Sequence, residues 1–241
     1  MLHKTRGIAL HSIKYSETSL ITKVYTDAFG MQSYLLKGVR SPKSRLKPAL
    51  FQPLALLDLV VYKKEQTTLQ NVKEVRLAAS YRTLTSDIRK SSIALFLTEL
   101  VYKSIREEEP NPGLFTFLWN AFTLLDAAEG NFSSFHLLFA MKFCRYLGFQ
   151  PQPNRSESNR FFHLREGSFF PVFHSAADCL DETESSWFLS LMQTDLEHQP
   201  MLVIPSGIRH RMLEKILSYY RFHLHGFQEI RSHKILHTVL S

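Results

Sequence analysis

Short runs in which apolar and polar residues alternate fill the first third of the chain. The runs cover residues 7–15, 19–26, 31–36, 54–62 and 68–77. Alternation with a period of two is typical of β-strands that bury one face. Five short strands separated by turn residues predict a small closed or partly closed β-barrel. A β-sandwich or an open sheet has the same periodicity, so both remain alternatives.

The pattern changes after residue 80, where apolar residues recur every three or four positions. This spacing is typical of helices that bury one face. The predicted helices cover residues 81–109, 114–128, 133–147, 185–197, 209–223 and 228–239. Gly148 follows the third of these and fits a helix C-cap.

A small β-hairpin interrupts the helices. A polar loop with two prolines, residues 150–159, leads into the predicted hairpin at residues 160–172. The predicted fold class is therefore α+β, with an N-terminal five-stranded β-barrel followed by a mainly α-helical domain that carries the hairpin as an insertion. We place the two domains at residues 1–79 and 80–241.

Charge is distributed unevenly along the 241 residues, whose formal net charge is +7. The first 80 residues hold 13 lysines and arginines against 5 acidic residues, whereas the rest hold 16 against 17. The whole basic excess therefore lies in the predicted barrel, which indicates that this part meets an anionic partner.

Composition gives no sign of an oxidising compartment or a membrane. Two cysteines, Cys144 and Cys179, cannot build a disulfide framework. The first residues lack the continuous apolar segment of a signal peptide. No apolar run reaches the roughly 18 residues that would span a bilayer. We expect a cytoplasmic protein.

Most of the basic excess is concentrated in one loop between the third and fourth predicted strands. The loop, KGVRSPKSRLK, carries five cations and no acidic residue, and Pro42 and Pro48 keep it from forming a regular helix or a central strand. Its cations are Lys37, Arg40, Lys43, Arg45 and Lys47. A solvated loop without a partner is the simpler interpretation. A phosphate backbone is the ligand that such a cluster would bind, and we expect these five residues to contact it, with Arg6 and Lys23 as weaker contributors.

Aromatic residues in the second and third strands extend this hypothesis. Small barrels of the oligonucleotide-binding (OB) type bind nucleic acid across one face, by combining cations with aromatic rings on which bases stack. Alternation can place Lys23, Tyr25, Gln32 and Tyr34 on an outer face. Tyr25 and Tyr34 are thus candidate stacking residues, and ordinary core aromatics are the alternative.

The sequence gives only weak evidence for catalytic or metal-binding residues. His233 and His237 are four residues apart on a predicted helix, but no glutamate follows His233 as a metalloprotease helix would require. The chain has neither a nucleophile elbow nor a phosphate-binding loop. We therefore expect a binding protein with no metal and no other cofactor, rather than an enzyme.

Four segments resemble the RecO family of bacterial recombination mediators. They are GIALHSIKYSETSLITKVYTDAFG from Gly7, LLKGVRSPKSRLKPALFQPLALLDLVVY from Leu35, RYLGFQP from Arg145, and LEKILSYYRFHLHGFQEIRSHKIL from Leu213. The E-T-S-L element at 17–20 and the K-G-x-R-x-x-x-S-R element at 37–45 are the most specific. The segments touch both ends and the middle, so the resemblance covers the whole chain.

The resemblance implies an OB-fold barrel, a helical domain and a nucleoid-associated role in the bacterial cytoplasm. It implies binding of single- and double-stranded DNA, annealing of complementary strands and, with the partner RecR, loading of RecA onto DNA coated by single-strand-binding protein. Family members recognise the acidic tail of single-strand-binding protein, which would need an apolar pocket edged by cations. Lys142 and Arg145 lie beside apolar helix positions and could edge it; plain surface cations are the alternative.

One departure concerns zinc. Many members of the family carry a four-cysteine zinc module after the L-G-F-x-P turn, but here that stretch contains no cysteine. We expect packed phenylalanines of the hairpin to replace the metal: Phe161, Phe162, Phe169 and Phe170.

Two other functions remain open from the sequence. An RNA-binding OB-fold protein of ribosome or tRNA biology would look similar over its first 80 residues. A nuclease would need a catalytic constellation that the sequence does not offer. The oligomeric state, the order of partner binding and the full path of DNA are not specified by the sequence.

Overall fold

The computed structural model describes residues 1–39, 47–64, 67–105 and 108–240. The chain forms two compact units. Unit 1 comprises Met1–Ser86 and Ile105–Asp126, and unit 2 comprises Asp87–Ser104 and Ala127–Ser241. The domain boundary that we place between residues 79 and 80 stays a prediction.

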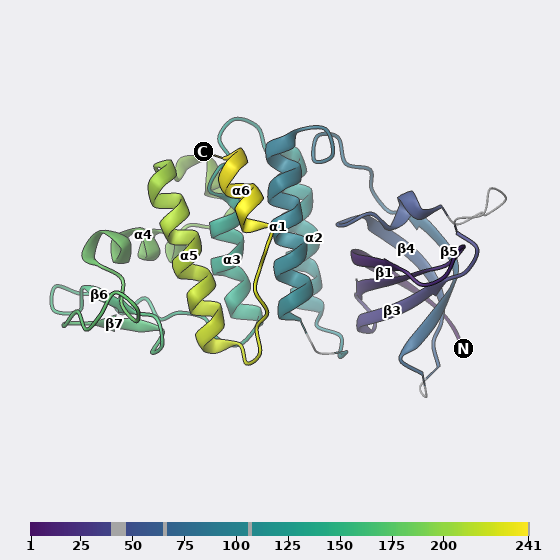
Figure 1. Cartoon of the computed structure of the whole chain (residues 1–241), viewed down its shortest axis with the longest axis horizontal. Helices are drawn as coiled ribbons and strands as arrows, with labels where there is room; N and C mark the ends of the chain where they lie inside the picture. The colour runs from purple at the N-terminus through teal and green to yellow at the C-terminus, as the bar shows by residue number, and fades with distance from the viewer. Residues whose placement is uncertain (40–46, 65–66, 106–107, 241) are drawn as a thin grey trace. The chain divides into compact units, whose positions relative to one another are not determined.

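Unit 1 is built on a closed five-stranded barrel (Figure 1). Its strands are β1 (Leu2–Lys14), β2 (Leu20–Thr26), β3 (Gly30–Leu36), β4 (Leu56–Tyr62) and β5 (Leu69–Leu77), with a short 3-10 helix η1 (Pro48–Phe51) before β4. Around the barrel the order is β1-β2-β3-β5-β4, and β3 pairs with β5 in parallel while the other neighbours are antiparallel. The predicted barrel is confirmed, and the sandwich and open-sheet alternatives are wrong.

Alternate residues of each strand point into the barrel and form its core. The core residues are Ala9, Val24, Tyr34, Leu36, Val39, Phe51, Ala55, Leu57, Leu59 and Val61. Gly7 leaves space for these core side chains, because a Cβ atom there would lie 2.5 Å from Val24 Cγ1 and 2.9 Å from Leu59 Cδ1. Because side chains alternate, the residues between these core positions lie on the outside of the barrel.

Helix α2 (Pro112–Ala127) belongs to unit 1 and covers part of the outside of the barrel. Phe115 of this helix stacks on Tyr25, with ring centroids 6.3 Å apart. The Arg6 guanidinium lies 5.3 Å and 5.1 Å from the ring centroids of Phe115 and Trp119. Helix α2 therefore covers Tyr25 near the end of β2 and packs against Arg6 of β1.

The predicted helix 81–109 is wrong at its N-terminal end, because helix α1 is confined to Ile88–Ser104. The backbone N–H groups of residues 82–84 donate instead to the carboxylate of Asp126, at 2.8–3.0 Å. A charged acceptor that satisfies three donors at once holds this segment in a non-helical turn. The helix itself begins after Asp87, whose side chain accepts the backbone N–H groups of Arg89 at 2.8 Å and Lys90 at 3.4 Å.

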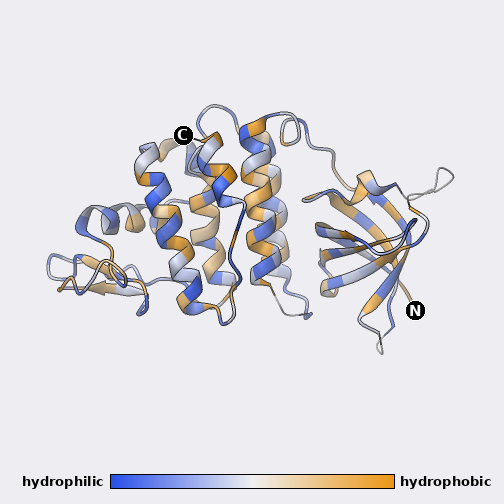
Figure 2. Ribbon diagram, in the orientation of Figure 1, coloured by the Kyte–Doolittle hydropathy of each residue, from blue (hydrophilic) through white to orange (hydrophobic). Residues whose placement is uncertain are grey.

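Unit 2 packs its helices around α3 (Phe135–Tyr146), which contacts α1, α4 (Glu182–Gln193) and α5 (Ser206–His223). Most of α3 is buried, and the ribbon colours of Figure 2 mark hydrophobic residues along the packed helices. Cys144 lies in this core as predicted, and burial raises the pKa of its thiol to about 12. A short 3-10 helix η2 (Leu196–Met201) precedes α5.

The C-terminal helix α6 (His233–Val239) is tied to α1 by Glu99. The Glu99 carboxylate accepts the backbone N–H groups of Arg231 and Ser232, the Ser232 hydroxyl and the Lys103 ammonium. Burial opposes the ionisation of Glu99, but these hydrogen bonds together outweigh it and lower the pKa to about 2. An ionised carboxylate therefore anchors the start of α6 at neutral pH.

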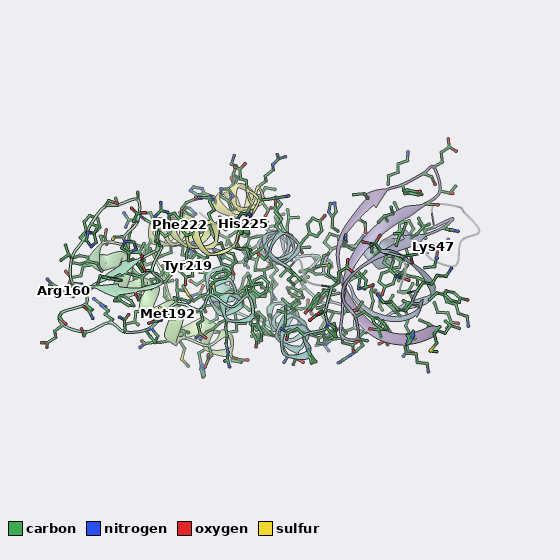
Figure 3. All side chains as sticks on the ribbon, turned by 90° about the horizontal axis from the view of Figure 1, so that it is seen from below. Lys47, Arg160, Met192, Tyr219, Phe222 and His225 are labelled. Carbon is green, nitrogen blue, oxygen red and sulfur yellow. The ribbon has the colours of Figure 1, made fainter. Side chains whose placement is uncertain are left out.

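The predicted hairpin is confirmed as β6 (Phe161–His163) paired with β7 (Ser168–Phe170). Its turn uses Gly167 at φ +66°, a conformation that favours glycine. The side-chain amide of Asn154 pairs with both the N–H and the C=O of Phe169, as a third strand would. Phe162 is fully buried, and its ring contacts Phe169, Phe188 and Tyr219 (Figure 3 labels Tyr219).

No helix in the described ranges is long and apolar enough to cross a membrane. The same ranges contain no group of three or more histidine, cysteine or acidic side chains placed to hold a metal ion.

Candidate nucleic-acid interface

The outer surface of β2 and β3 is a candidate site because it joins cations, apolar groups and a lack of acids. Its side chains form two rows that run across the strands. One row is His11, Lys23 and Ser33, and the next is Ile13, Ile21 and Leu35. None of β1, β2 and β3 contains an acidic residue. We call these two rows, together with Lys14, Tyr15, Lys37 and Lys47, the cationic face.

The cations at one end of the barrel are brought together by strand register. Lys14 at the end of β1 is opposite Leu20, and Leu20 is opposite Leu36 at the end of β3. Lys37 follows Leu36 directly, and both lysines are exposed. Adjacent strands lie about 4.8 Å apart, so the ends of β1 and β3 are separated by about 10 Å across β2.

Lys47 belongs to the same end of the barrel. It is exposed and immediately precedes η1, whose Phe51 carbonyl accepts a hydrogen bond from Ser12 of β1 at 3.2 Å (Figure 3). The basic loop therefore starts at the end of β3 and finishes beside the second half of β1. Arg40, Lys43 and Arg45 fall within residues 40–46, which lie outside the described residues, so their predicted contacts stay predictions.

A hollow elsewhere on the barrel has a different charge pattern from the cationic face. It lies over the outer surface of β1, β4 and β5 and has a volume of about 920 Å³. We call it the mixed-charge groove; its lining includes Lys4, Arg6, Asp27, Asp58, Lys73, Glu74 and Arg76. Three ion pairs lie in it: Arg6–Asp27 at 3.3 Å, Arg76–Asp58 at 3.0 Å and Lys73–Glu74 at 3.5 Å. Carboxylates in this groove repel phosphate, whereas the strands of the cationic face have none.

Both predicted stacking residues are corrected by the structure. Tyr34 points into the barrel and is 1% exposed, and burial raises the pKa of its hydroxyl far above the ordinary value. Tyr25 is on the outer side, as predicted, but α2 covers it and leaves it 1% exposed. Gln32 also points inward, and its amide oxygen accepts the Lys63 ammonium at 2.8 Å. None of these three side chains can stack on a base.

Lys23 and Arg6 have separate places in unit 1. Lys23 lies at the centre of the cationic face, between His11 and Ser33. Arg6 lines the mixed-charge groove, pairs with Asp27 and packs on α2. Lys23 therefore lies on the same face of the barrel as the ends of the basic loop, whereas Arg6 lies in the mixed-charge groove.

The two predicted partner-binding residues in unit 2, Lys142 and Arg145, differ in their contacts within the protein. The Lys142 ammonium donates to the Asp195 carboxylate and to the Met192 carbonyl, both at 3.0 Å, and so caps the C-terminal end of α4 (Figure 3). Arg145 lies three residues further along α3 and is exposed. Arg145 is thus the more available of the two.

Several residues of the cationic face escaped the sequence-based prediction. Lys14 ends β1 and Tyr15 follows it, and Ile13 is 50% exposed although it is apolar. Tyr15 is 60% exposed. The alternation of the first strand, continued into the turn, is the signal that could have identified them.

A closed OB-type barrel with a cationic face, followed by a helical domain, defines a protein of the OB-fold class. Comparison with known proteins identifies its family. Residues 1–81 match the model for the N-terminal part of recombination protein O, and residues 85–229 match the model for its C-terminal part. The chain belongs to the RecO family of DNA repair proteins.

Proteins named DNA repair protein RecO match the chain over nearly their full length. The chain is 36% identical to the DNA repair protein RecO of Flavobacterium psychrophilum, over 99% of both chains. It is also 36% identical to the RecO proteins of Phocaeicola vulgatus, over 100% of both chains, and of Bacteroides fragilis, over 98% of both.

Proposed function

We propose that this protein is a recombination mediator that binds single- and double-stranded DNA through the cationic face and anneals complementary strands. The observation that carries the proposal is the separation of charge on one barrel. The mixed-charge groove holds acids already paired with cations, while the strands of the cationic face hold cations and no acid.

This separation suits annealing, which brings two polyanions together. When lysines bind phosphates, the DNA releases condensed counterions and the repulsion between the two strands falls. This effect does not depend on the base sequence. No step in this mechanism breaks a covalent bond, so the proposal is a non-enzymatic one. Membership of the family supports partnership with RecR, with single-strand-binding protein and, indirectly, with the RecA filament. The exposed Arg145 is our candidate contact for the acidic tail of single-strand-binding protein.

Annealing of complementary oligonucleotides that are pre-coated with single-strand-binding protein tests the function. We expect the wild-type protein to accelerate duplex formation and the Lys23→Ala/Lys37→Ala/Lys47→Ala variant to lose most of that acceleration. Fluorescence transfer between end-labelled strands measures the rate. Equal acceleration by the variant, or cleavage of the strands in the presence of a divalent metal, would contradict the proposal. Stronger binding of structured RNA than of single-stranded DNA would favour the RNA-binding alternative.

A further inference from the structure

Tyr15 is a large aromatic side chain held in solvent at the edge of the cationic face. It continues the outward alternation of Ile13, one residue beyond the end of β1. Its backbone is fixed, because its N–H donates to the Ser19 carbonyl at 3.0 Å across the β1–β2 turn. The ring nevertheless remains 60% exposed. A fixed backbone that presents an exposed ring gives a preorganised surface for contact.

The strands beside Tyr15 present apolar groups and cations, and one acid, Glu17, lies in the β1–β2 turn that follows it. Ile13 is 50% exposed and lies across from Ile21, which lies across from Leu35. Lys14 and Lys37 flank this apolar row at the end of the barrel. A ligand for such a surface needs flat apolar faces attached to a chain of negative charges.

Unpaired nucleotides have this chemistry, and paired ones do not. A single strand offers base faces for stacking on aromatic side chains and phosphates for lysines. A duplex keeps its base faces stacked inside and offers only phosphates and groove edges. The apolar row would gain nothing from a duplex.

We infer that Tyr15, supported by Ile13, is a base-stacking residue of the barrel and gives the protein a preference for single strands over duplex. This inference rests on the proposed DNA binding, and it replaces the role that Tyr25 and Tyr34 cannot play. Lysines of the cationic face supply affinity common to both forms of DNA, and the tyrosine adds affinity for the unpaired form alone.

The test compares three ligands of equal length: an oligothymidylate, the same backbone without bases, and a duplex. For the Tyr15→Ala variant we expect binding of oligothymidylate to weaken about 10-fold, which corresponds to one lost stacked base. Binding of the abasic strand and of the duplex should be unchanged, and so should the slope of log affinity against log salt. Tyr15→Phe should bind all three ligands as the wild type does, because it keeps the ring.

Tyr62→Ala is the matched control. Tyr62 is 40% exposed but lies at the end of β4, beside Leu2 on the face that carries the mixed-charge groove. We expect this variant to bind all three ligands as the wild type does.

Each contrary result overturns the inference in a recognisable way. Unchanged oligothymidylate binding by Tyr15→Ala shows that the patch serves another ligand, such as a peptide. An equal loss for the abasic strand shows a backbone contact instead of stacking, and a loss in Tyr15→Phe shows that the hydroxyl carries the contact. A wild-type protein that binds none of the three ligands overturns the proposed function itself.

Discussion

Removing three lysines from the cationic face is expected to weaken single-stranded DNA binding about 100-fold at 0.1 M salt. The variant is Lys23→Ala/Lys37→Ala/Lys47→Ala, which changes one residue at the centre of the face and two at the ends of the basic loop. Each phosphate contact to a single strand adds about 0.7 to the slope of log affinity against log salt. Losing three contacts should therefore make the slope shallower by about 2. Between 1 M salt, where this electrostatic contribution vanishes, and 0.1 M salt, such a change in slope corresponds to a loss of affinity of about 100-fold.

A control variant removes the same formal charge from the opposite side of the barrel. Lys4→Ala/Lys73→Ala/Arg76→Ala changes only the mixed-charge groove, where Lys73 and Arg76 already pair with Glu74 and Asp58. Exposed charges further apart than about 10 Å are largely screened at 0.1 M salt. We expect its affinity to stay within about 3-fold of the wild type and its salt slope to be unchanged. Equal losses in both variants, measured by fluorescence anisotropy across a salt series, would show that net charge matters and that the face does not.

Truncating Phe162 is expected to lower the free energy of unfolding of unit 2 by about 3–5 kcal/mol. Phe162 is 0% exposed and connects the hairpin to α4 and α5 through Phe188 and Tyr219. The cavity left by Phe162→Ala has aromatic rings on several sides, and rings in a packed core cannot fully collapse into it. Phe173→Ala is the control, because Phe173 is 41% exposed and its ring contacts Phe161 at the edge of the hairpin. Its cost should stay below about 1 kcal/mol.

Urea unfolding in a Trp119→Phe background measures both substitutions. The chain has two tryptophans, so Trp187 of α4 then reports on unit 2 alone. The same experiment tests the expectation that aromatic packing replaces the family's zinc module. The unfolding midpoint should be the same with and without a chelator. A lower midpoint in chelator, or a cost below about 1 kcal/mol for Phe162→Ala, would contradict it.

The barrel and the hairpin could be predicted because their signals are local. Period-two alternation identified the five strands, and a glycine at the turn identified the hairpin. No local signal determines which side chains of a strand face the core, because shifting the assignment by one residue exchanges the inner and outer side chains. The sequence therefore predicts the wrong side of the strand for Tyr34. It predicts the correct side for Tyr25, but Phe115, ninety residues away in the sequence, covers that side chain.

Long-range polar contacts account for the other differences between the structure and the prediction from the sequence. Asp126 binds the backbone of residues 82–84 and holds this segment in a non-helical turn before α1. Asp27 pairs with Arg6 and places that cation in the mixed-charge groove. Asp195 binds Lys142, which therefore caps α4. Each of these partners is an ordinary acidic residue in the sequence, and only the fold shows which cation or backbone it meets.

Lysine footprinting of the wild-type protein tests the central claim most directly. The reactivity of each amine toward an acetylating reagent is measured by mass spectrometry, with and without a saturating single strand. We expect protection of Lys14, Lys23, Lys37 and Lys47, while Lys4 and Lys73 react as they do in the free protein. Protection of Lys4 and Lys73 with unchanged reactivity at Lys23 and Lys37 would place DNA in the mixed-charge groove and contradict the account.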